Sequence, residues 1–314
     1  MKAFVKKIYG GPEVLHLEEV DKPLLKDDHL LIKVFANSVN PADWHILRGD
    51  PYFARFTFGL FKPKEKILGA DFAGVVEALG REVRDFNVGD RVFGELLNGG
   101  AFAEYVSAPE NVCAKMPRGV DFATMACLPI AGLTALQALT THGKLKQKES
   151  VLINGASGGV GHFAVQIAKA LGGNVTAVCS SKNVDFVRSL GADQVLAYDR
   201  ENIHEHNGKY DIVIDTNGNL FFDDFTRMGR RGVLIGFTTL GLMVSNMLKK
   251  SFSKFSLVVF TSEANTDDLK TLASFIENGK ISVHIDKTFP YSEIPKAIEY
   301  IERMRTRGKV AMVW

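Results

Sequence analysis

Residues 151–161 read Val-Leu-Ile-Asn-Gly-Ala-Ser-Gly-Gly-Val-Gly, and this stretch decides the fold of the chain. A short apolar run at 151–153 enters a glycine turn, and apolar residues at helical spacing follow from Val160 to Leu171. A strand, a glycine turn and a helix N-terminus present free backbone N–H groups and the positive end of the helix dipole to a pyrophosphate. Glycine is needed there because a side chain would hold the phosphates away from the backbone. The stretch therefore predicts a dinucleotide-binding unit.

The residues after the turn support this prediction. A second apolar strand at 174–179 closes a β-α-β unit of about thirty residues. Glycine also collects in flexible loops, so a turn that binds no ligand is the alternative for the glycines alone. The candidate cofactor contacts in the turn are Gly155, Ser157, Gly158, Gly159, Val160 and Gly161.

The end of the strand 174–179 distinguishes the two common dinucleotides. An Asp or Glu at this place would bind the ribose hydroxyls of NAD. This chain has Ser180, Ser181 and Lys182 there, and no carboxylate comes before Asp185 in the following helix. Small hydroxyls and a lysine suit the dianionic 2′-phosphate of NADP(H), which an acidic residue would repel. The sequence favours NADP(H), with an ordinary solvated lysine as the alternative for Lys182.

Length and composition exclude several classes of protein. The 314 residues suffice for two domains, and 46% hydrophobic with 24% charged residues is typical of a soluble globular protein. A net charge of +2 gives no indication of nucleic-acid binding. No run approaches the length of a membrane span, and the first residues lack the apolar core of a signal peptide. Three widely spaced cysteines fit a reduced compartment, so we expect a cytoplasmic protein.

The chain contains two kinds of pattern. Residues 1–110 hold short strand-like runs between glycines, which predict a compact antiparallel β domain. Later strands and helices alternate, which predicts an α/β, doubly wound parallel sheet with helices on both faces. Its expected strands are 151–154, 174–179, 194–198, 210–215, 232–237 and 256–260. Helices at 267–278 and 292–304 and a last strand at 310–313 should return the chain to the first domain. The expected domains are residues 1–125 with 264–314, and residues 126–263.

Six stretches carry a family resemblance. They are 37–43, 67–74, 88–94, 100–105, 155–161 and 189–193, and in this order they resemble the medium-chain dehydrogenase/reductase superfamily over essentially the whole chain. The resemblance implies that residues 1–125 and 264–314 form a GroES-like antiparallel β domain. It implies that residues 126–263 form a Rossmann-type NADP-binding domain.

The zinc ligands of the alcohol dehydrogenases in this superfamily are missing. Those enzymes carry a cysteine ligand at the place of Asn40 and Gly-His-Glu at the place of Gly69-Ala70-Asp71. Alanine cannot ligate a metal, and an isolated Asp71 does not replace the missing soft ligands. The chain also runs from Gly94 to Gly100 with no cysteine, so the second, four-cysteine zinc site is absent too. We therefore expect no metal, and the chain most resembles the zinc-free quinone oxidoreductase branch, which includes zeta-crystallin-like and 2-alkenal reductases.

This resemblance implies an NADPH-dependent oxidoreductase that transfers hydride to quinones or α,β-unsaturated carbonyls. Negative charge then spreads onto an oxygen that needs only hydrogen-bond donors. In this branch an asparagine and a tyrosine line the substrate cleft, and Asn40 and Tyr52 match them. His45, where some relatives have another tyrosine, is a candidate donor. The alternatives are a turn asparagine before Pro41, a packed tyrosine and a structural histidine.

Other cofactor contacts follow from the resemblance and from the binding of ligands at the carboxyl ends of strands in open α/β sheets. They are Thr134 near the nicotinamide, Tyr198 near the 2′-phosphate, and Asn217, Gly236 and Phe237. We also expect a homodimer in which the strand 256–260 pairs with its copy. No residue is a convincing general acid. A non-catalytic NADPH-binding protein with a structural, RNA-binding or assembly role is therefore the alternative function, and a metal-independent alcohol dehydrogenase is a second one.

Overall fold

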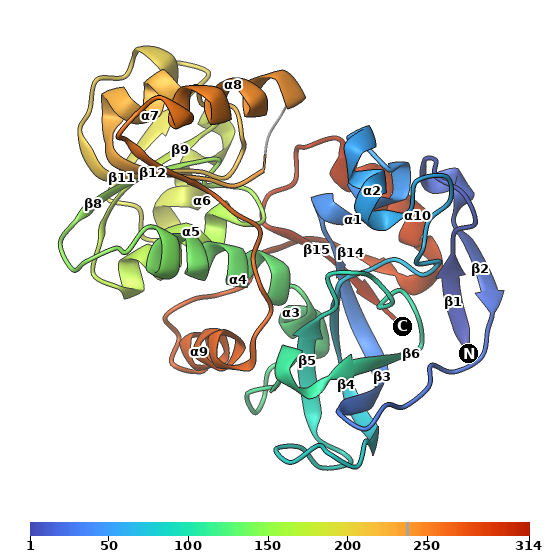
Figure 1. Cartoon of the computed structure of the whole chain (residues 1–314). Coiled ribbons are helices and arrows are strands. Elements are labelled where there is room, and N and C mark those ends of the chain that lie inside the picture. The colour runs from blue at the N-terminus through green and yellow to red at the C-terminus, as the bar shows by residue number, and fades with distance from the viewer. Residues whose placement is uncertain (237–238) are drawn as a thin grey trace. The chain divides into compact units, whose positions relative to one another are not determined.

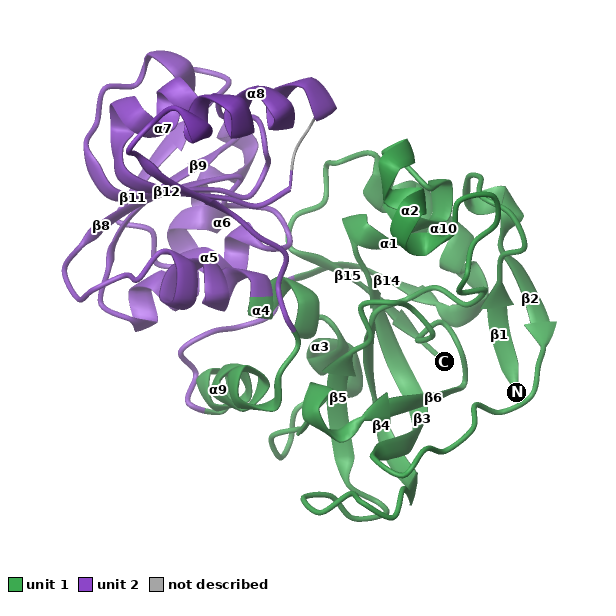
Figure 2. Cartoon of the chain, viewed as in Figure 1, with its two compact units in different colours: residues 1–133, 264–277, 285–314 green, residues 134–263, 278–284 purple. Residues whose placement is uncertain are grey.

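The chain forms two compact units in a computed structural model that describes residues 1–236 and 239–314 (Figure 1). Unit 1 holds residues 1–133, 264–277 and 285–314, and unit 2 holds residues 134–263 and 278–284 (Figure 2). Two short segments differ from the division expected from the sequence. Residues 126–133 join unit 1, where the Ile130 N–H donates to the Asp71 carboxylate. Residues 278–284 join unit 2, where the Ser282 N–H donates to Gln166 at 2.8 Å.

Unit 1 is built on a mainly antiparallel sheet. In the described residues its strands follow the order β14-β15-β3-β4-β5-β7, and β6 pairs with β3. Their bounds are β3 His29–Val39, β4 Asp71–Leu79, β5 Arg91–Glu95, β6 Tyr105–Pro109, β7 Cys113–Lys115, β14 Ile285–Pro290 and β15 Lys309–Val313. A separate pair consists of β1 Lys2–Val5 and β2 His16–Glu19. β15 lies antiparallel beside β3, which confirms the expected return of the C-terminal strand to this unit.

The helices of unit 1 cover this sheet and its ends. They are α1 Pro41–Arg48, α2 Arg55–Phe58, α3 Phe122–Ala126, α9 Thr266–Glu277 and α10 Ile294–Glu302, and α4 Pro129–Gln137 begins here. α10 is held by an apolar stripe at helical spacing, formed by Ile294, Ala297, Ile298 and Ile301. This stripe packs into one core cluster with Leu47 of α1 and Met312 of β15.

Unit 2 contains the predicted doubly wound sheet. Its strands in the described residues are all parallel, in the order β10-β9-β8-β11-β12-β13. The strands are β8 Ser150–Asn154, β9 Asn174–Cys179, β10 Gln194–Ala197, β11 Tyr210–Asp215, β12 Gly229–Leu234 and β13 Ser256–Val259. The helices are α5 Gly161–Ala170, α6 Val184–Ser189, α7 Phe222–Met228 and α8 Leu240–Ser251, with a π-helical turn at Ala138–His142. The chain leaves β8 toward β9 and β10 and then crosses to β11, so the sheet has its topological switch point between β8 and β11.

One strand of unit 2 differs from the prediction. The strand expected at 232–237 runs from Gly229 to Leu234, because it pairs with β11 from Tyr210 onward. Its first residues include the charged Arg230 and Arg231, which form ion pairs with Asp211 and Glu149. The helices expected at 267–278 and 292–304 are α9 and α10, each within two residues at both ends. No helix in the described residues combines the length and apolar character that crossing a bilayer requires.

Candidate functional site

Two glycines of the turn after β8 are required by the fold itself. Gly155 has φ +82°, and a Cβ there would lie 2.6 Å from the Thr216 hydroxyl oxygen. A Cβ on Gly161, the first residue of α5, would lie 2.1 Å from the Gly155 carbonyl oxygen. A left-handed backbone and close strand–helix packing therefore explain both of these glycines without a ligand.

Gly158 is different, because the fold does not require glycine at this position. Among the described residues, a Cβ there would meet only the Gly155 carbonyl oxygen, at an ordinary 3.4 Å, and the Gly158 backbone is not left-handed. Next in the turn, α5 begins without a side-chain cap, and the first N–H groups of a helix have no intrahelical partners. The turn lies at the switch point of the sheet, where a pyrophosphate binds in such folds. These residues fit a dinucleotide.

The residues expected near the 2′-phosphate form a linked loop. The Asn183 amide donates to the Ser157 hydroxyl at 3.0 Å and to that of Ser180 at 3.3 Å. Ser181 donates its backbone N–H and its hydroxyl to the Asp199 carboxylate, at 2.7 and 2.6 Å. These bonds lower the Asp199 pKa.

The Asp199 carboxylate is a neighbour that sequence reasoning missed. Asp199 follows β10, next to the half-exposed Tyr198. It is therefore far in the sequence from residues 180–182, on which the cofactor prediction was based. Lys182 follows Ser181 in this loop and is exposed.

The loop after β11 is organised by a buried carboxylate. Asp215 accepts backbone N–H groups from Asn217, Gly218 and Leu220 at 3.0, 2.9 and 2.8 Å, and the Asn154 amide at 2.8 Å. Burial raises the Asp215 pKa, and these hydrogen bonds oppose the increase. Asn217 is therefore held just after β11, and its role as a cofactor contact stays a prediction.

The remaining cofactor candidates have less structure around them. The Thr134 hydroxyl donates to that of Ser262 at 3.0 Å. Gly236 has φ +71°, and a Cβ added to it would meet nothing within 4 Å among the described residues. Phe237 lies outside the described residues.

In unit 1, Asn40 belongs to a buried polar cluster around Asp71. One Asp71 oxygen accepts from the Ser38 hydroxyl at 2.5 Å and from the Asn40 amide at 2.9 Å, and the other accepts from the Ile130 N–H at 2.9 Å. The Lys309 ammonium donates to the Asn40 side-chain oxygen at 2.5 Å and lies 3.5 Å from Asp71. Ser38, Asn40, Asp71 and Lys309 are all buried.

Asn40 also begins α1. Its backbone N–H donates to the Asp43 carboxylate at 2.7 Å, which is the reciprocal half of a capping box. The turn asparagine that the sequence offered as the alternative is thus present, and its side chain is hydrogen-bonded to Asp71 and to Asp43. Asn40 as a substrate donor stays a prediction.

The Asp71 cluster does not fit a zinc ion. A metal at this position would compete for the Asn40 oxygen with the Lys309 ammonium, and two buried cations would repel each other. Asn40 and Asp71 are also oxygen ligands, whereas zinc sites take most of their ligands from cysteine and histidine. Within the described residues, no three His, Cys, Asp or Glu side chains are placed to hold a metal.

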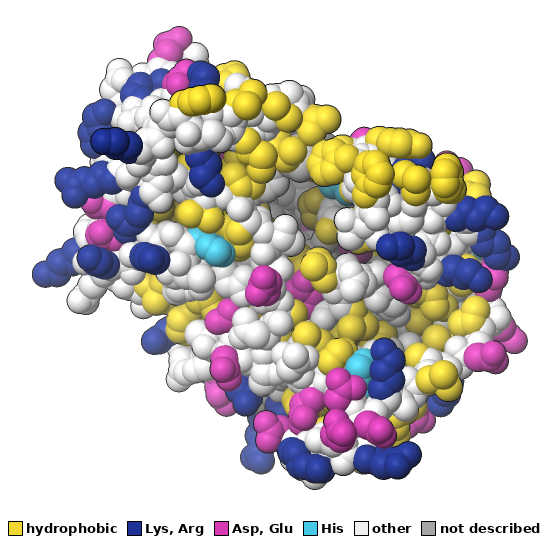
Figure 3. All heavy atoms as spheres, in the orientation of Figure 1, with side chains coloured by type: hydrophobic (Ala, Val, Ile, Leu, Met, Phe, Trp, Pro, Cys, Tyr) yellow, Lys and Arg dark blue, Asp and Glu magenta, His cyan; other side chains and the backbone are white. Residues whose placement is uncertain are grey.

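His45 and Tyr52 lie on the segment that follows Asn40. The His45 ring nitrogen Nδ1 is 2.9 Å from the Asp50 carbonyl oxygen, and burial lowers the His45 pKa. Tyr52 is 63% exposed, with the Arg55 guanidinium 4.5 Å from its ring centre. Phe53, Phe56 and Phe61 are exposed nearby, and Figure 3 shows hydrophobic side chains gathered over α2. Tyr52 is thus largely exposed and packs against Arg55, and its role as a substrate contact stays a prediction.

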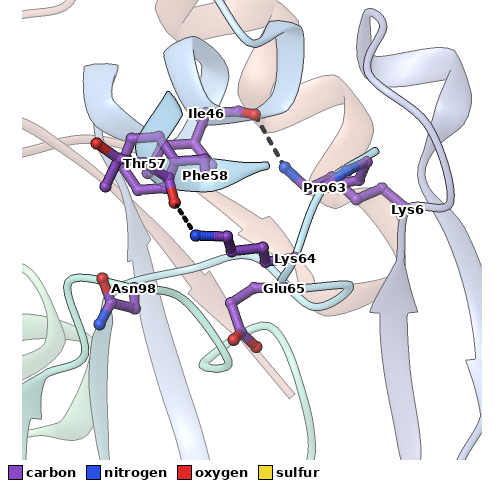
Figure 4. A pocket seen from close by; sticks show the side chains of 8 residues that line it. All are labelled: Lys6, Ile46, Thr57, Phe58, Pro63, Lys64, Glu65 and Asn98. Atoms are coloured by element: carbon purple, nitrogen blue, oxygen red, sulfur yellow. Dashed lines mark hydrogen bonds between the residues drawn. The ribbon is translucent and has the colours of Figure 1, made fainter. Parts of the chain in front are cut away.

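A cavity of about 220 Å³ lies beside the same segment (Figure 4). Lys6 and Lys64 line it, and each is tied to a backbone carbonyl: Lys6 to that of Ile46 and Lys64 to that of Thr57, both at 2.9 Å. Burial lowers the Lys6 pKa to about 8, and Asp43 opposes this. Lys6 therefore ties α1 to the chain just after β1, and Lys64 ties the chain after α2 back to that helix.

Glu95 is the residue of unit 1 that sequence reasoning missed. It ends β5, opposite Asp71 of β4, and is 1% exposed. Neither carboxyl oxygen has a hydrogen-bond partner in the described part of the chain. Burial, then Asp71, raises its pKa to about 8, and Lys309 opposes this. The available signal was a lone carboxylate inside the apolar run Val92 to Leu97.

The glycine analysis gives a first prediction. Gly158→Ala should weaken NADPH binding at least about tenfold, because its methyl group enters the space left for the phosphates, and should leave Tm nearly unchanged. Gly161→Ala should destabilise unit 2 by more than about 2 kcal/mol, because of the backbone clash. Fluorescence titration with NADPH and thermal unfolding measure the two effects.

The matched control is Gly241→Ala, at a position in α8 where φ is ordinary and a Cβ would meet no described residue within 4 Å. It should alter neither binding nor folding adversely. NADPH affinity unchanged in Gly158→Ala would contradict the assignment of the turn to the pyrophosphate.

Glu95 gives a prediction for stability. The folded protein binds its proton more tightly than the unfolded chain, because its pKa rises from 4.5 to about 8. Stability from this group is therefore highest below pH 4.5 and falls as the pH rises toward 8. Glu95→Gln should match the wild type at pH 5 and exceed its free energy of unfolding at pH 9 by a few kcal/mol, since one pKa unit is worth about 1.4 kcal/mol.

Urea unfolding at the two pH values measures this difference. The control is Glu77→Gln, at an exposed carboxylate of β4 paired with Lys22. It should show no such gain at pH 9. The same pH slope in Glu95→Gln as in the wild type would rule out a raised pKa.

Two family models match the chain. Residues 26–118 match the alcohol dehydrogenase GroES-like domain, and residues 190–312 match a family described as zinc-binding dehydrogenase. The chain is 36% identical over 304 residues to the chloroplast envelope quinone oxidoreductase homolog of Arabidopsis thaliana, across 92% of this chain and 90% of the relative. It is 35% identical over 329 residues to the chloroplastic NADPH-dependent alkenal/one oxidoreductase of the same plant, across 99% of this chain and 79% of the relative.

The fold has a close match among solved structures. The quinone oxidoreductase from Coxiella burnetii superposes with a TM-score of 0.88 and 31% identity, over 100% of this chain and 99% of that one. The parallel sheet of unit 2 and the GroES-like sheet of unit 1 are thus confirmed as the expected fold class. The chain belongs to the medium-chain dehydrogenase/reductase superfamily, in the group that contains quinone oxidoreductases and alkenal reductases.

Proposed function

We propose that this protein is a zinc-independent, NADPH-dependent reductase of quinones or α,β-unsaturated carbonyls. The observation that carries the proposal is the buried Lys309 ammonium on the oxygen of Asn40. The family resemblance puts a zinc ligand of the alcohol dehydrogenases at the place of Asn40. Relatives that are 35–36% identical over most of the chain are named as a quinone oxidoreductase homolog and an NADPH-dependent alkenal/one oxidoreductase. They support the same chemistry.

The acceptor class follows from what these residues offer. An ammonium or amide N–H stabilises charge only by hydrogen bonding and electrostatics, whereas a metal polarises a carbonyl as a Lewis acid. A simple ketone concentrates the developing charge on one oxygen. A quinone or enone delocalises it, so that one or two donors suffice. We propose Asn40 as one donor and Tyr52 and His45 as further substrate contacts.

NADPH is the proposed cofactor, and when bound it would supply the hydride. We propose that Gly158, Gly159 and Val160 hold its pyrophosphate and that Ser180, Ser181, Lys182 and Tyr198 surround its 2′-phosphate. The Asn183 amide holds Ser180 in place for this contact. Ser181 gives both of its donors to the Asp199 carboxylate, whose charge would repel the phosphate, so Lys182 has to supply the attraction. Thr134 and Asn217 complete the set toward the nicotinamide, with Gly236 and Phe237.

We further propose a cytoplasmic homodimer. The cysteines at 113, 127 and 179 are buried free thiols, which suits a reducing compartment. β13 pairs only with β12 in the described residues, so one edge of the parallel sheet is available to a second copy. Both features support the proposal without identifying the compartment.

The proposed activity is tested by NADPH oxidation with purified, chelator-treated protein. We expect turnover of a quinone or a 2-alkenal and none of a saturated aldehyde, because only the conjugated acceptors delocalise the charge. Product analysis should show loss of the alkenal double bond. NADPH binding without turnover of any acceptor would contradict the proposal and favour the non-catalytic alternative.

The cofactor preference is tested by Lys182→Ala. We expect its Kd for NADPH to rise about tenfold, because a charge-assisted contact to the 2′-phosphate is lost. The Kd for NADH, which lacks this phosphate, should stay within about twofold. Lys250→Ala, an exposed lysine of α8, is the control and should change neither value. Equal weakening for both cofactors would remove Lys182 from the phosphate site.

A further inference from the structure

Glu95 is a buried acid that the proposed chemistry has not used. It is 1% exposed, and both of its carboxyl oxygens are without hydrogen-bond partners among the described residues. A buried polar group without a partner costs about 1–3 kcal/mol, and such groups are rare in native proteins. An orphaned acid at this position therefore indicates a function that compensates for its cost.

The sheet places Glu95 opposite Asp71, the carboxylate to which the substrate candidate Asn40 donates. β3 ends at Val39, β4 begins at Asp71 and β5 ends at Glu95. Because these neighbouring strands are antiparallel, the three residues lie at the same end of the sheet. Ser38 is opposite Asp71, and Asp71 is opposite Glu95. Opposite residues of antiparallel strands have Cβ atoms about 4.5–5.5 Å apart on one face. Asp71 also accepts from the Asn40 amide, so Asn40 and Glu95 flank the same carboxylate.

Charged groups from three other elements act on Glu95. Asp71 of β4 and Asp43 of α1 favour the protonated acid, as does burial, and Lys309 of β15 opposes it. The resulting pKa of about 8 keeps the proton on Glu95 at neutral pH. The Asp43 pKa is itself raised to about 7 by burial, with a contribution from Asp71. Lys309 is the nearby cation that can stabilise the carboxylate after the proton has left.

We propose that Glu95 is the proton donor of the reduction, and that its acceptor is the α-carbon of a 2-alkenal or enone. The proposal rests on the proposed function. It supplies the general acid that sequence reasoning did not find. It also implies that reduction of an alkenal or enone needs this acid, whereas reduction of a quinone does not.

The proposed step balances in atoms and charge. Hydride addition at the β-carbon converts the π pair of the double bond into an enolate. The enolate α-carbon then forms a C–H bond with the Glu95 proton, and the O–H electron pair stays on Glu95 as a carboxylate. Solvent returns one proton to Glu95 before the next turnover. A quinone needs no proton at carbon, because its reduced form is an oxyanion that water protonates.

The test uses the full chain, NADPH and two acceptors, an α-methyl 2-alkenal and a quinone. Protonation of the first creates a stereocentre at the α-carbon, which chiral chromatography reads directly. We expect the wild type to form one enantiomer and its alkenal kcat to fall as the pH rises through about 8, because the acid ionises. Glu95→Gln should lose about 10²-fold or more in alkenal kcat, lose this pH limb and give mixed enantiomers. Its quinone kcat should fall less than about tenfold.

Two controls separate this role from a structural one. Glu77→Gln, an exposed carboxylate on the same sheet, should behave as the wild type. Tm and NADPH affinity report whether Glu95→Gln is folded, and the wild-type pH profiles for the two acceptors test the proposal even if it is not. An unchanged alkenal rate, pH limb and enantiomer ratio in folded Glu95→Gln would overturn the role of Glu95 alone. No turnover of either acceptor by the wild type would overturn the proposed function and this inference together.

Discussion

The structure of unit 1 depends on the neutralisation of one buried carboxylate. Asp71 is fully buried, and an ionised carboxylate without partners would cost several kcal/mol in such a place. Its partners come from separate parts of the chain: Ser38 at the end of β3, Asn40 before α1, the Ile130 N–H at the start of α4, and Lys309 at the start of β15. The C-terminal strand therefore brings the counter-charge of this sheet as well as apolar surface. The same bonds orient Asn40, so the stability of the unit and the geometry of its candidate site have one cause.

Much of the architecture is visible in the sequence, because it follows from local patterns. The buried strands β8, β9 and β11 are short apolar runs, and α10 shows its stripe at 294, 297, 298 and 301. β12 was misplaced because Arg230 and Arg231 have partners, Asp211 and Glu149, that only the fold brings near. The Asp199 carboxylate escaped notice for a related reason: it follows β10, and the parallel pairing of β10 with β9 brings it to Ser181. Local reasoning finds elements and misses groups that register places side by side.

Glycine shows the same limit within a single turn. The sequence presents Gly155, Gly158 and Gly161 as one phosphate-binding signature. The structure separates them by physical cause, since positive φ explains the first and a 2.1 Å clash explains the last. Of these three, Gly158 is left without a reason in the fold, and it is therefore the position whose substitution reports on the ligand rather than on folding.

The charges of the Asp71 cluster constrain its chemistry further. Three carboxyl groups, Asp43, Asp71 and Glu95, act on one another and on the Lys309 ammonium in a buried environment. Burial and the neighbouring carboxyl groups raise the pKa of Asp43 and of Glu95. The Asp43 carboxylate accepts the Asn40 backbone N–H and so helps to begin α1, whereas the Glu95 carboxyl group has no hydrogen-bond partner among the described residues. A metal-free site can stabilise an enolate with hydrogen bonds, but the carbon of that enolate still needs a proton. Of these three acids, Glu95 is the one whose carboxyl group makes no hydrogen bond to a described residue. It can therefore give up its proton without breaking such a bond.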